Sequence, residues 1–298
     1  MPRQLITALS LAIVMILSAA CTVTEMDYSK SIGTSSASEA SANRHDGSRD
    51  KKKEAAETYV QLGLGYLRKG DRTRARTNLL KALEKDDSSG AAHNAMALLL
   101  QLEDEAELAE EHFEKAMLHE PEMTRYRYNY SVFLLRQNRY EDAYEQFTIA
   151  AEDINYGRRA RVFYSLGLIS SHLSKPDEAK KSWEKAVKLN PQLAGPFLEL
   201  ADLYFKMGDY PKAKRYLGQY EKLSKPAPRA LWLAVRLEYA FGNKDGEASK
   251  AMALKNMFPY SEQALEYKAW LKSREDGVQS LFPTAKDTLD KKDSLKIQ

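Results

Sequence analysis

The feature that most constrains this chain is a two-helix pattern that recurs about every 34 residues. Its clearest copy is residues 160–191, which read as two amphipathic helices joined by a short turn. The landmarks of this copy are a Leu-Gly pair, two alanines around a tryptophan, and a proline: Leu166, Gly167, Ala179, Trp183, Ala186 and Pro191. One such unit cannot bury its own apolar face, so the copies have to stack on one another.

The same order of landmarks appears six times along the chain. The units begin near residues 56, 90, 124, 160, 194 and 228, in steps of 34, 34, 36, 34 and 34. The two extra residues lie near Asn155, Tyr156 and Gly157, and they predict a longer loop and a bend between units three and four. The sixth unit is the weakest match, because Glu247 occupies the position where its second helix should carry an alanine.

Local chemistry predicts where the helices end. Glycines followed by Asp or Asn are expected at the turns that close first helices, namely Gly70, Gly208 and Gly242. Prolines are expected to stop second helices, because proline cannot continue a helix interior; these are Pro121, Pro191 and Pro259.

The sequence after Pro259 predicts one more helix over residues 261–273. A single amphipathic helix there would cover the exposed face of the sixth unit, with Leu265, Ala269 and Trp270 as its contacts. The repeat domain is therefore expected to span residues 55–273, and residues 274–298 to form a polar tail.

The period and the order of landmarks resemble the tetratricopeptide repeat family. The resemblance implies an all-α fold, a right-handed superhelical solenoid of helix-turn-helix units with a C-terminal capping helix. It also implies a concave groove built by the first helix of each unit. The side chains that this would place on the groove are Arg68, Asn94, Gln101, Arg125, Tyr128, Arg136, Arg161, Tyr164, His172, Asp202, Phe205, Lys206, Arg229, Trp232, Arg236 and Tyr239.

This set predicts a basic groove with aromatic residues between the charges. Arginine, tyrosine and tryptophan are the residue types that anchor protein interfaces, so a peptide or protein partner is favoured. The alternative is that the charges only keep the helices soluble and that the aromatic residues belong partly to the core. A basic and aromatic groove also fits nucleic acid, but a net charge of +3 is too small to argue for it, and a secreted protein does not normally meet it.

Residues 1–20 have the organisation of a secretory signal. A charge at Arg3 precedes an apolar run over residues 5–17 and a small-residue site at 18–20. The run is shorter than the roughly 20 residues of a transmembrane helix.

The sequence Leu-Ser-Ala-Ala-Cys at residues 17–21 resembles the lipobox of bacterial lipoproteins, with Ser18 where that family usually has leucine. The resemblance implies that Cys21 becomes the lipidated first residue. Thr22 follows it instead of Asp, which implies the periplasmic face of the outer membrane. The alternative is an ordinary signal peptide with an incidental cysteine. Residues 21–54 are rich in Ser, Thr, Lys and Asp and are expected to form a disordered tether.

Catalytic constellations are not evident in the sequence. It contains no nucleophile elbow, phosphate-binding loop or dinucleotide fingerprint. His112 and His119 could share a helix face, but no third metal ligand is evident, so structural or surface roles are expected for all five histidines. We therefore predict a non-enzymatic protein without a cofactor, a metal or a small-molecule substrate.

Taken together, the lipobox, the Ser-rich spacer, six units and a terminal helix after Phe258, Pro259, Tyr260 and Ser261 resemble the type IV pilus biogenesis lipoproteins, the pilotins of the pilus secretin. This resemblance implies a scaffold that binds the secretin and promotes its outer-membrane localisation and multimerisation. One alternative is another tetratricopeptide lipoprotein that serves β-barrel assembly or cell-wall enzymes. The other, an enzyme with a helical-repeat appendage, is disfavoured by the missing metal motif and by the lack of sequence left for a catalytic domain.

Overall fold

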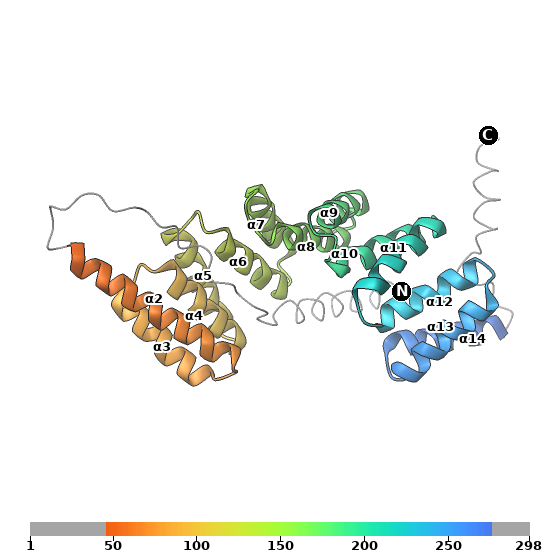
Figure 1. The fold of residues 1–298 in the computed structure, drawn as a ribbon, viewed down its shortest axis with the longest axis horizontal. Coiled ribbons are helices and arrows are strands. Elements are labelled where there is room, and N and C mark those ends of the chain that lie inside the picture. Colours follow the sequence, from red (N-terminus) through yellow and green to blue (C-terminus); the bar gives the residue numbers. More distant parts are fainter. Residues whose placement is uncertain (1–45, 276–298) are drawn as a thin grey trace. The chain divides into compact units, whose positions relative to one another are not determined.

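The structure is a computed structural model that describes residues 46–275 (Figure 1). These residues form helices joined by short turns, with no strand among them. They fold as two compact units, each built of several repeats, which divide between Tyr156 and Gly157. From here on, unit one and unit two mean these two parts, and the two-helix units of the sequence are called repeats. The predicted signal peptide, Cys21 and most of the polar tail lie outside the described residues.

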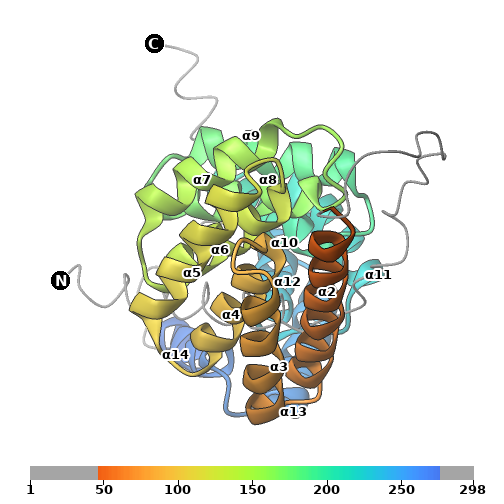
Figure 2. The ribbon, with the colours of Figure 1, turned by 90° about the vertical axis from the view of Figure 1, so that its left-hand side faces the viewer.

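Unit one contains three pairs of helices. They are α2 Asp46–Arg68 with α3 Arg72–Lys85, α4 Gly90–Leu102 with α5 Ala106–His119, and α6 Thr124–Arg136 with α7 Tyr140–Glu152. Each first helix also contacts its neighbouring pair, so that α4 lies against both α2 and α3 (Figure 2).

Unit two contains three more pairs and a terminal helix. They are α8 Arg159–His172 with α9 Pro176–Leu189, α10 Ala194–Lys206 with α11 Tyr210–Leu223, α12 Pro228–Ala240 with α13 Lys244–Met257, and finally α14 Glu262–Glu275. Helix α14 packs against both α12 and α13. The predicted all-α architecture of helix-turn-helix repeats with a capping helix is confirmed.

One backbone feature reproduces the predicted register in all six repeats. A residue with positive φ closes the first helix of every pair: Gly70, Asp104, Asn138, Ser174, Gly208 and Gly242, with φ between 59° and 76°. Their spacing repeats the steps of the sequence, including the single step of 36. Glycine adopts this left-handed conformation without strain, and Asp and Asn tolerate it better than most residues.

The second helices place small residues against the first helices. Each of the first four second helices buries two alanines around a larger residue, such as Ala179 and Ala186 around Trp183. In the sixth repeat Glu247 replaces the first alanine, and its Oε1 accepts a hydrogen bond of 2.6 Å from Nη1 of Arg274 in the capping helix. The sixth repeat therefore departs from the pattern at the position that contacts the capping helix, which packs on both helices of this repeat.

The ends of the second helices follow the prolines as predicted. Helices α5, α9 and α13 each end two residues before Pro121, Pro191 and Pro259. The linker between α7 and α8 covers residues 153–158, against 120–123 and 190–193 elsewhere. The expected longer loop is therefore present, and it coincides with the division between the two units.

Two expected details differ from the structure. Helix α2 begins at Asp46, within the segment expected to be a tether; its exposed residues 50–54 are Asp, Lys and Glu, and lysine and glutamate extend a helix at little cost. The capping helix buries Ala264, Tyr267 and Trp270, whereas Leu265 is 57% exposed and Ala269 is also exposed. The helix is turned so that its two aromatic rings, which have the larger apolar area, meet α12.

Candidate protein-binding surface

In unit one, the first helices α2, α4 and α6 together form a narrow recess. Its lining consists of Val60, Leu64, Ala91, Asn94, Leu98, Arg125 and Asn129. Nδ2 of Asn129 donates a hydrogen bond of 2.9 Å to Oδ1 of Asn94, which is only 5% exposed. Asn94 therefore joins α4 to α6 and offers little surface of its own to a partner.

Arg125 is half-buried in this recess, and its guanidinium lies over the ring of Tyr126 at 5.3 Å from the centroid. Its Nε is buried and has no hydrogen-bond partner among the described residues, which costs about 1–3 kcal/mol. The structure thus places two predicted residues, Asn94 and Arg125, in one recess.

Three further predicted arginines keep their charge uncompensated within the described part of the chain. Arg68 and Arg161 are exposed and Arg136 is half-buried, and none of the three forms an ion pair with a described residue. Tyr128 differs from the prediction, because it is buried and packs on Phe147 at a ring-centroid distance of 5.7 Å. It belongs to the core of its own helix pair.

In unit two, a predicted groove residue is tied to a buried acid. Arg229 in α12 binds Glu199 in α10 through two hydrogen bonds of 2.7 Å. Its Nη1 donates to Oε1 of Glu199, and its Nη2 donates to Oε2. The Glu199 side chain is 7% exposed. Burial opposes the charge of Arg229, but the Glu199 carboxylate outweighs burial and holds the arginine pKa above its usual value. Arg229 therefore joins two repeats.

Asp202 is the second acid of this network. Nζ of Lys206 lies 2.7 Å from one carboxylate oxygen of Asp202, and Arg229 and Arg236 approach at 3.5 Å and 3.6 Å. Burial would raise the pKa of Asp202, but the cations, Arg229 first, lower it. The guanidinium of Arg236 also lies over the rings of Phe205 and Trp232.

These contacts make the face of unit two less basic than the sequence indicates, because three cations share two carboxylates. Lys206 is the most accessible of them, with 64% of its side chain exposed. Tyr164 packs against Gly195 of α10, and burial raises its pKa. His172 is half-buried at the end of α8, and Gln101 is half-buried on α4.

Two predicted aromatic groove residues are covered by the capping helix. Trp232 is 4% exposed and lies edge-on to Trp270 at 5.6 Å, and Tyr239 meets the same ring at 5.0 Å. Trp232 therefore belongs to the core between α12 and α14. The groove prediction for Trp232 applied the register of the other repeats, although the capping helix predicted from the same sequence covers this position.

Sequence reasoning missed Glu199 and Asn129. A signal for Glu199 exists: it is an acid inside an apolar helix, and Asp202 and Lys206 follow at spacings of three and four residues. Such spacing places the three side chains on one helix face. Asn129 carries no comparable signal, because one amide in a polar helix is ordinary.

Three histidines gather in unit one. Nδ1 of His93 lies 2.9 Å from Nδ1 of His112, and Nε2 of His93 lies 2.9 Å from the carbonyl oxygen of Asp87. A carbonyl oxygen only accepts, so Nε2 of His93 carries the proton and its Nδ1 accepts from His112. His119 stacks on His93 at a centroid distance of 5.6 Å. Burial, followed by the neighbouring His93, lowers the pKa of His112 to about 4.

This pair predicts that acid destabilises unit one. His112 has a pKa of about 6.5 when unfolded and about 4 when folded, so between these values only the unfolded chain takes up the proton. The contribution is fully present above pH 6.5 and is lost as the pH falls towards 4. Allowing for the partial exposure of His112, it amounts to roughly 2 kcal/mol.

The measurement is the free energy of unfolding by urea at pH 7.0 and at pH 4.5 for the parent protein and for His112→Gln. The variant is expected to lose less stability between the two pH values than the parent. Equal losses in the two proteins would contradict the prediction.

The described residues hold no group of three or more His, Cys, Asp or Glu side chains placed to bind a metal ion. Between residues 46 and 275, every helix is too short or too polar to span a bilayer.

Family models of the tetratricopeptide repeat match more than half of the chain. One matches residues 98–157 and 198–261, and another matches residues 160–193. The fold and these matches define the class of the molecule, a helical-repeat scaffold of the tetratricopeptide type.

Similarity to individual proteins narrows this class. The type IV pilus assembly protein PilF of Pseudomonas aeruginosa is 40% identical over 216 residues, which cover 72% of this chain and 86% of PilF. A solved structure of P. aeruginosa PilF is 39% identical with a TM-score of 0.70 and covers 74% of this chain and 99% of its own. The crystal structure of PilW, a type IV pilus biogenesis factor, shares the fold at 24% identity and a TM-score of 0.63, over 71% of this chain and 97% of its own. The chain belongs to the PilF family of type IV pilus biogenesis proteins with tetratricopeptide repeats.

Proposed function

We propose that the protein is a non-enzymatic scaffold lipoprotein that binds the type IV pilus secretin and promotes its outer-membrane localisation and multimerisation. The observation that carries the proposal is the 40% identity to PilF over 86% of that protein's length. An array of helix pairs that exposes side chains from each first helix suits the holding of a protein segment.

Within each unit we propose a binding surface of its own, made of accessible residues on the first helices. In unit one these are Arg68, Arg125 and Arg136, and in unit two Arg161 and Lys206. Their charge favours a secretin segment, or a segment of another outer-membrane or periplasmic protein, that carries carboxylates. The ion pairs of Arg229 with Glu199 and Asp202 have a structural role, because they hold α10 and α12 together.

We propose that Cys21 carries the lipid and that the protein lies at the periplasmic face of the outer membrane. A thiol is required for thioether attachment, and Cys21 is the single cysteine of the chain. In this proposal the lipid is the protein's one contact with the membrane, and no cofactor takes part.

The experiment compares the parent with two variants in cells. Cys21→Ser is expected to move the protein from the outer-membrane fraction to the soluble or precursor fraction, because it removes the attachment site. Arg68→Glu/Arg136→Glu/Arg161→Glu is expected to leave the protein at the outer membrane but to weaken secretin binding by about tenfold or more, because opposite charges become like charges.

The readouts are membrane fractionation, secretin multimers on native gels, and the melting temperature of each purified variant. Unchanged fractionation of Cys21→Ser would overturn the lipid anchor. Normal multimers with the triple variant, at an unchanged melting temperature, would overturn the proposed surface. Absence of any secretin association of the parent would overturn the proposed partner.

A further inference from the structure

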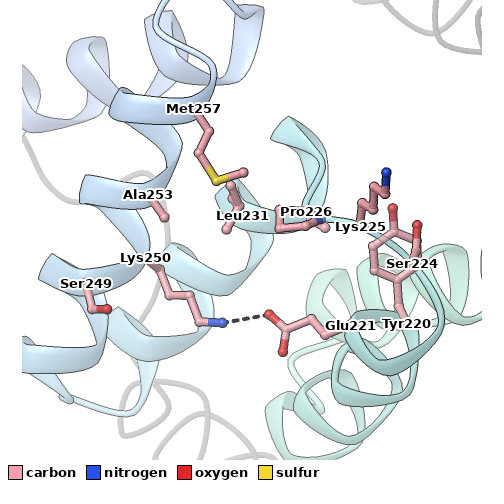
Figure 3. Close-up of a pocket in the computed structure, with 11 residues that line it drawn as sticks. Tyr220, Glu221, Ser224, Lys225, Pro226, Leu231, Ser249, Lys250, Ala253 and Met257 are labelled. Atoms are coloured by element: carbon pink, nitrogen blue, oxygen red, sulfur yellow. Dashed lines mark hydrogen bonds and ion pairs between the residues drawn. The ribbon is translucent and has the colours of Figure 1, made fainter.

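A second hollow lies in unit two, away from the surface proposed above. It has a volume of about 440 Å³ and lies between α11, α12, α13 and the linker that joins α11 to α12 (Figure 3). Its apolar wall includes Leu231, Ala253 and Met257, and the sulfur end of Met257 points towards Leu231. An engineered cavity of about 150 Å³ holds a benzene molecule, so this hollow has room for two large apolar side chains.

The linker of residues 224–227 forms one wall of the hollow. The linkers 86–89, 120–123 and 190–193 are each closed by a hydrogen bond from the last backbone N–H to the first carbonyl, as in Leu193 to Asn190 at 3.1 Å. The linker 224–227 has no such turn, and Ser224 and Ala227 are extended. Pro226 and Pro228 account for this, because a residue before proline avoids the helical conformation.

One end of the hollow is closed by an ion pair. Nζ of Lys250 in α13 lies 2.7 Å from a carboxylate oxygen of Glu221 in α11 (Figure 3). Glu221 is thereby neutralised. Lys225 at the rim and Lys222 in the last turn of α11 are exposed, and neither is paired with a described residue. Lys225 thus places an uncompensated positive charge at the edge of the hollow.

We propose that this hollow is a docking site for a peptide segment of a partner protein, one that inserts large apolar side chains and carries carboxylates beside them. The apolar wall and the volume select bulky aliphatic or aromatic side chains. Met257 is 52% exposed, and its flexible thioether adapts to the shape of an inserted group. Lys225 at the rim selects the acidic flank. The site uses α11, α13, the linker and the start of α12, and its lining shares no residue with the first-helix surface proposed above.

The experiment selects random 12-residue peptides displayed on phage against the full-length protein in detergent. Enriched peptides are expected to combine two large apolar residues with Asp or Glu. Ala253→Trp fills the hollow and is expected to weaken their binding by about tenfold or more. Lys225→Glu, which leaves the apolar wall intact, is expected to weaken it about three- to tenfold. The matched control is Met252→Trp, an exposed position on the same helix outside the hollow, which is expected to bind like the parent.

Several outcomes would overturn the proposal. One is the absence of peptides that distinguish the parent from Ala253→Trp, and another is the enrichment of basic peptides. Peptide binding that emerges only after Leu281→Asp/Phe282→Asp would assign the hollow to the chain's own C-terminal segment. A parent dimer in sedimentation that Ala253→Trp converts to monomers would assign it to a second copy.

Discussion

Replacing Gly167 by alanine is expected to lower the stability of unit two by about 2 kcal/mol, although alanine is the better helix former. A methyl group at this position would lie 2.8 Å from Cε2 of Trp183 and closer still to two other atoms of the indole ring. The ring is 3% exposed and rigid, so it cannot turn away without disturbing its other contacts. The melting temperature should fall by about 4–8 °C.

The matched control is Gly218→Ala, in the interior of helix α11. An added Cβ there meets nothing within 4 Å, so only the helix preference remains, and this variant should gain up to about 1 kcal/mol. Opposite signs for the same substitution are the test. If both variants shift the melting temperature in the same direction, the close approach of α8 and α9 does not have the role assigned to it here.

Replacing Arg229 by methionine is expected to cost about 3–5 kcal/mol, because Glu199 would keep a buried charge without its partner. The side chain of Glu199 is 7% exposed, and both of its oxygens accept from Arg229. The double variant Arg229→Met/Glu199→Met should recover most of the loss, since it removes both charges. Arg161→Met, at an exposed position without a described ion pair, is the control and should change the stability by less than about 0.5 kcal/mol.

Urea unfolding of the parent, of Arg229→Met and of the double variant identifies the cause. A deficit that the double variant does not relieve would show that Arg229 acts through packing alone.

Features that depend on one repeat could be predicted from the sequence. The period, the turns at Gly70 and Gly208 and the helix ends before Pro121 and Pro191 all follow from backbone preferences within a few residues. The extra two residues of the third linker could be located for the same reason, since only the register of neighbouring landmarks was needed.

The candidate site was predicted only in part. Arg68 and Arg161 are exposed, and their place on a binding groove stays a prediction. Arg229 and Trp232 also occupy register positions that were expected on the groove, but one is paired with an acid and the other is covered by the capping helix. Register specifies the face of a helix on which a residue lies, but not which side chain of the next helix meets it there.

By itself, the sequence determined the helix pairs, their number and their boundaries, because these rest on short-range backbone chemistry and on the spacing of small residues. The tertiary structure decided which charges remain free, which aromatic residues are buried, and where the linker of residues 224–227 leaves a hollow. The physical reason is distance along the chain: Glu199 and Arg229, or Trp232 and Trp270, are 30 or more residues apart. Their contacts exist only when neighbouring helices have packed.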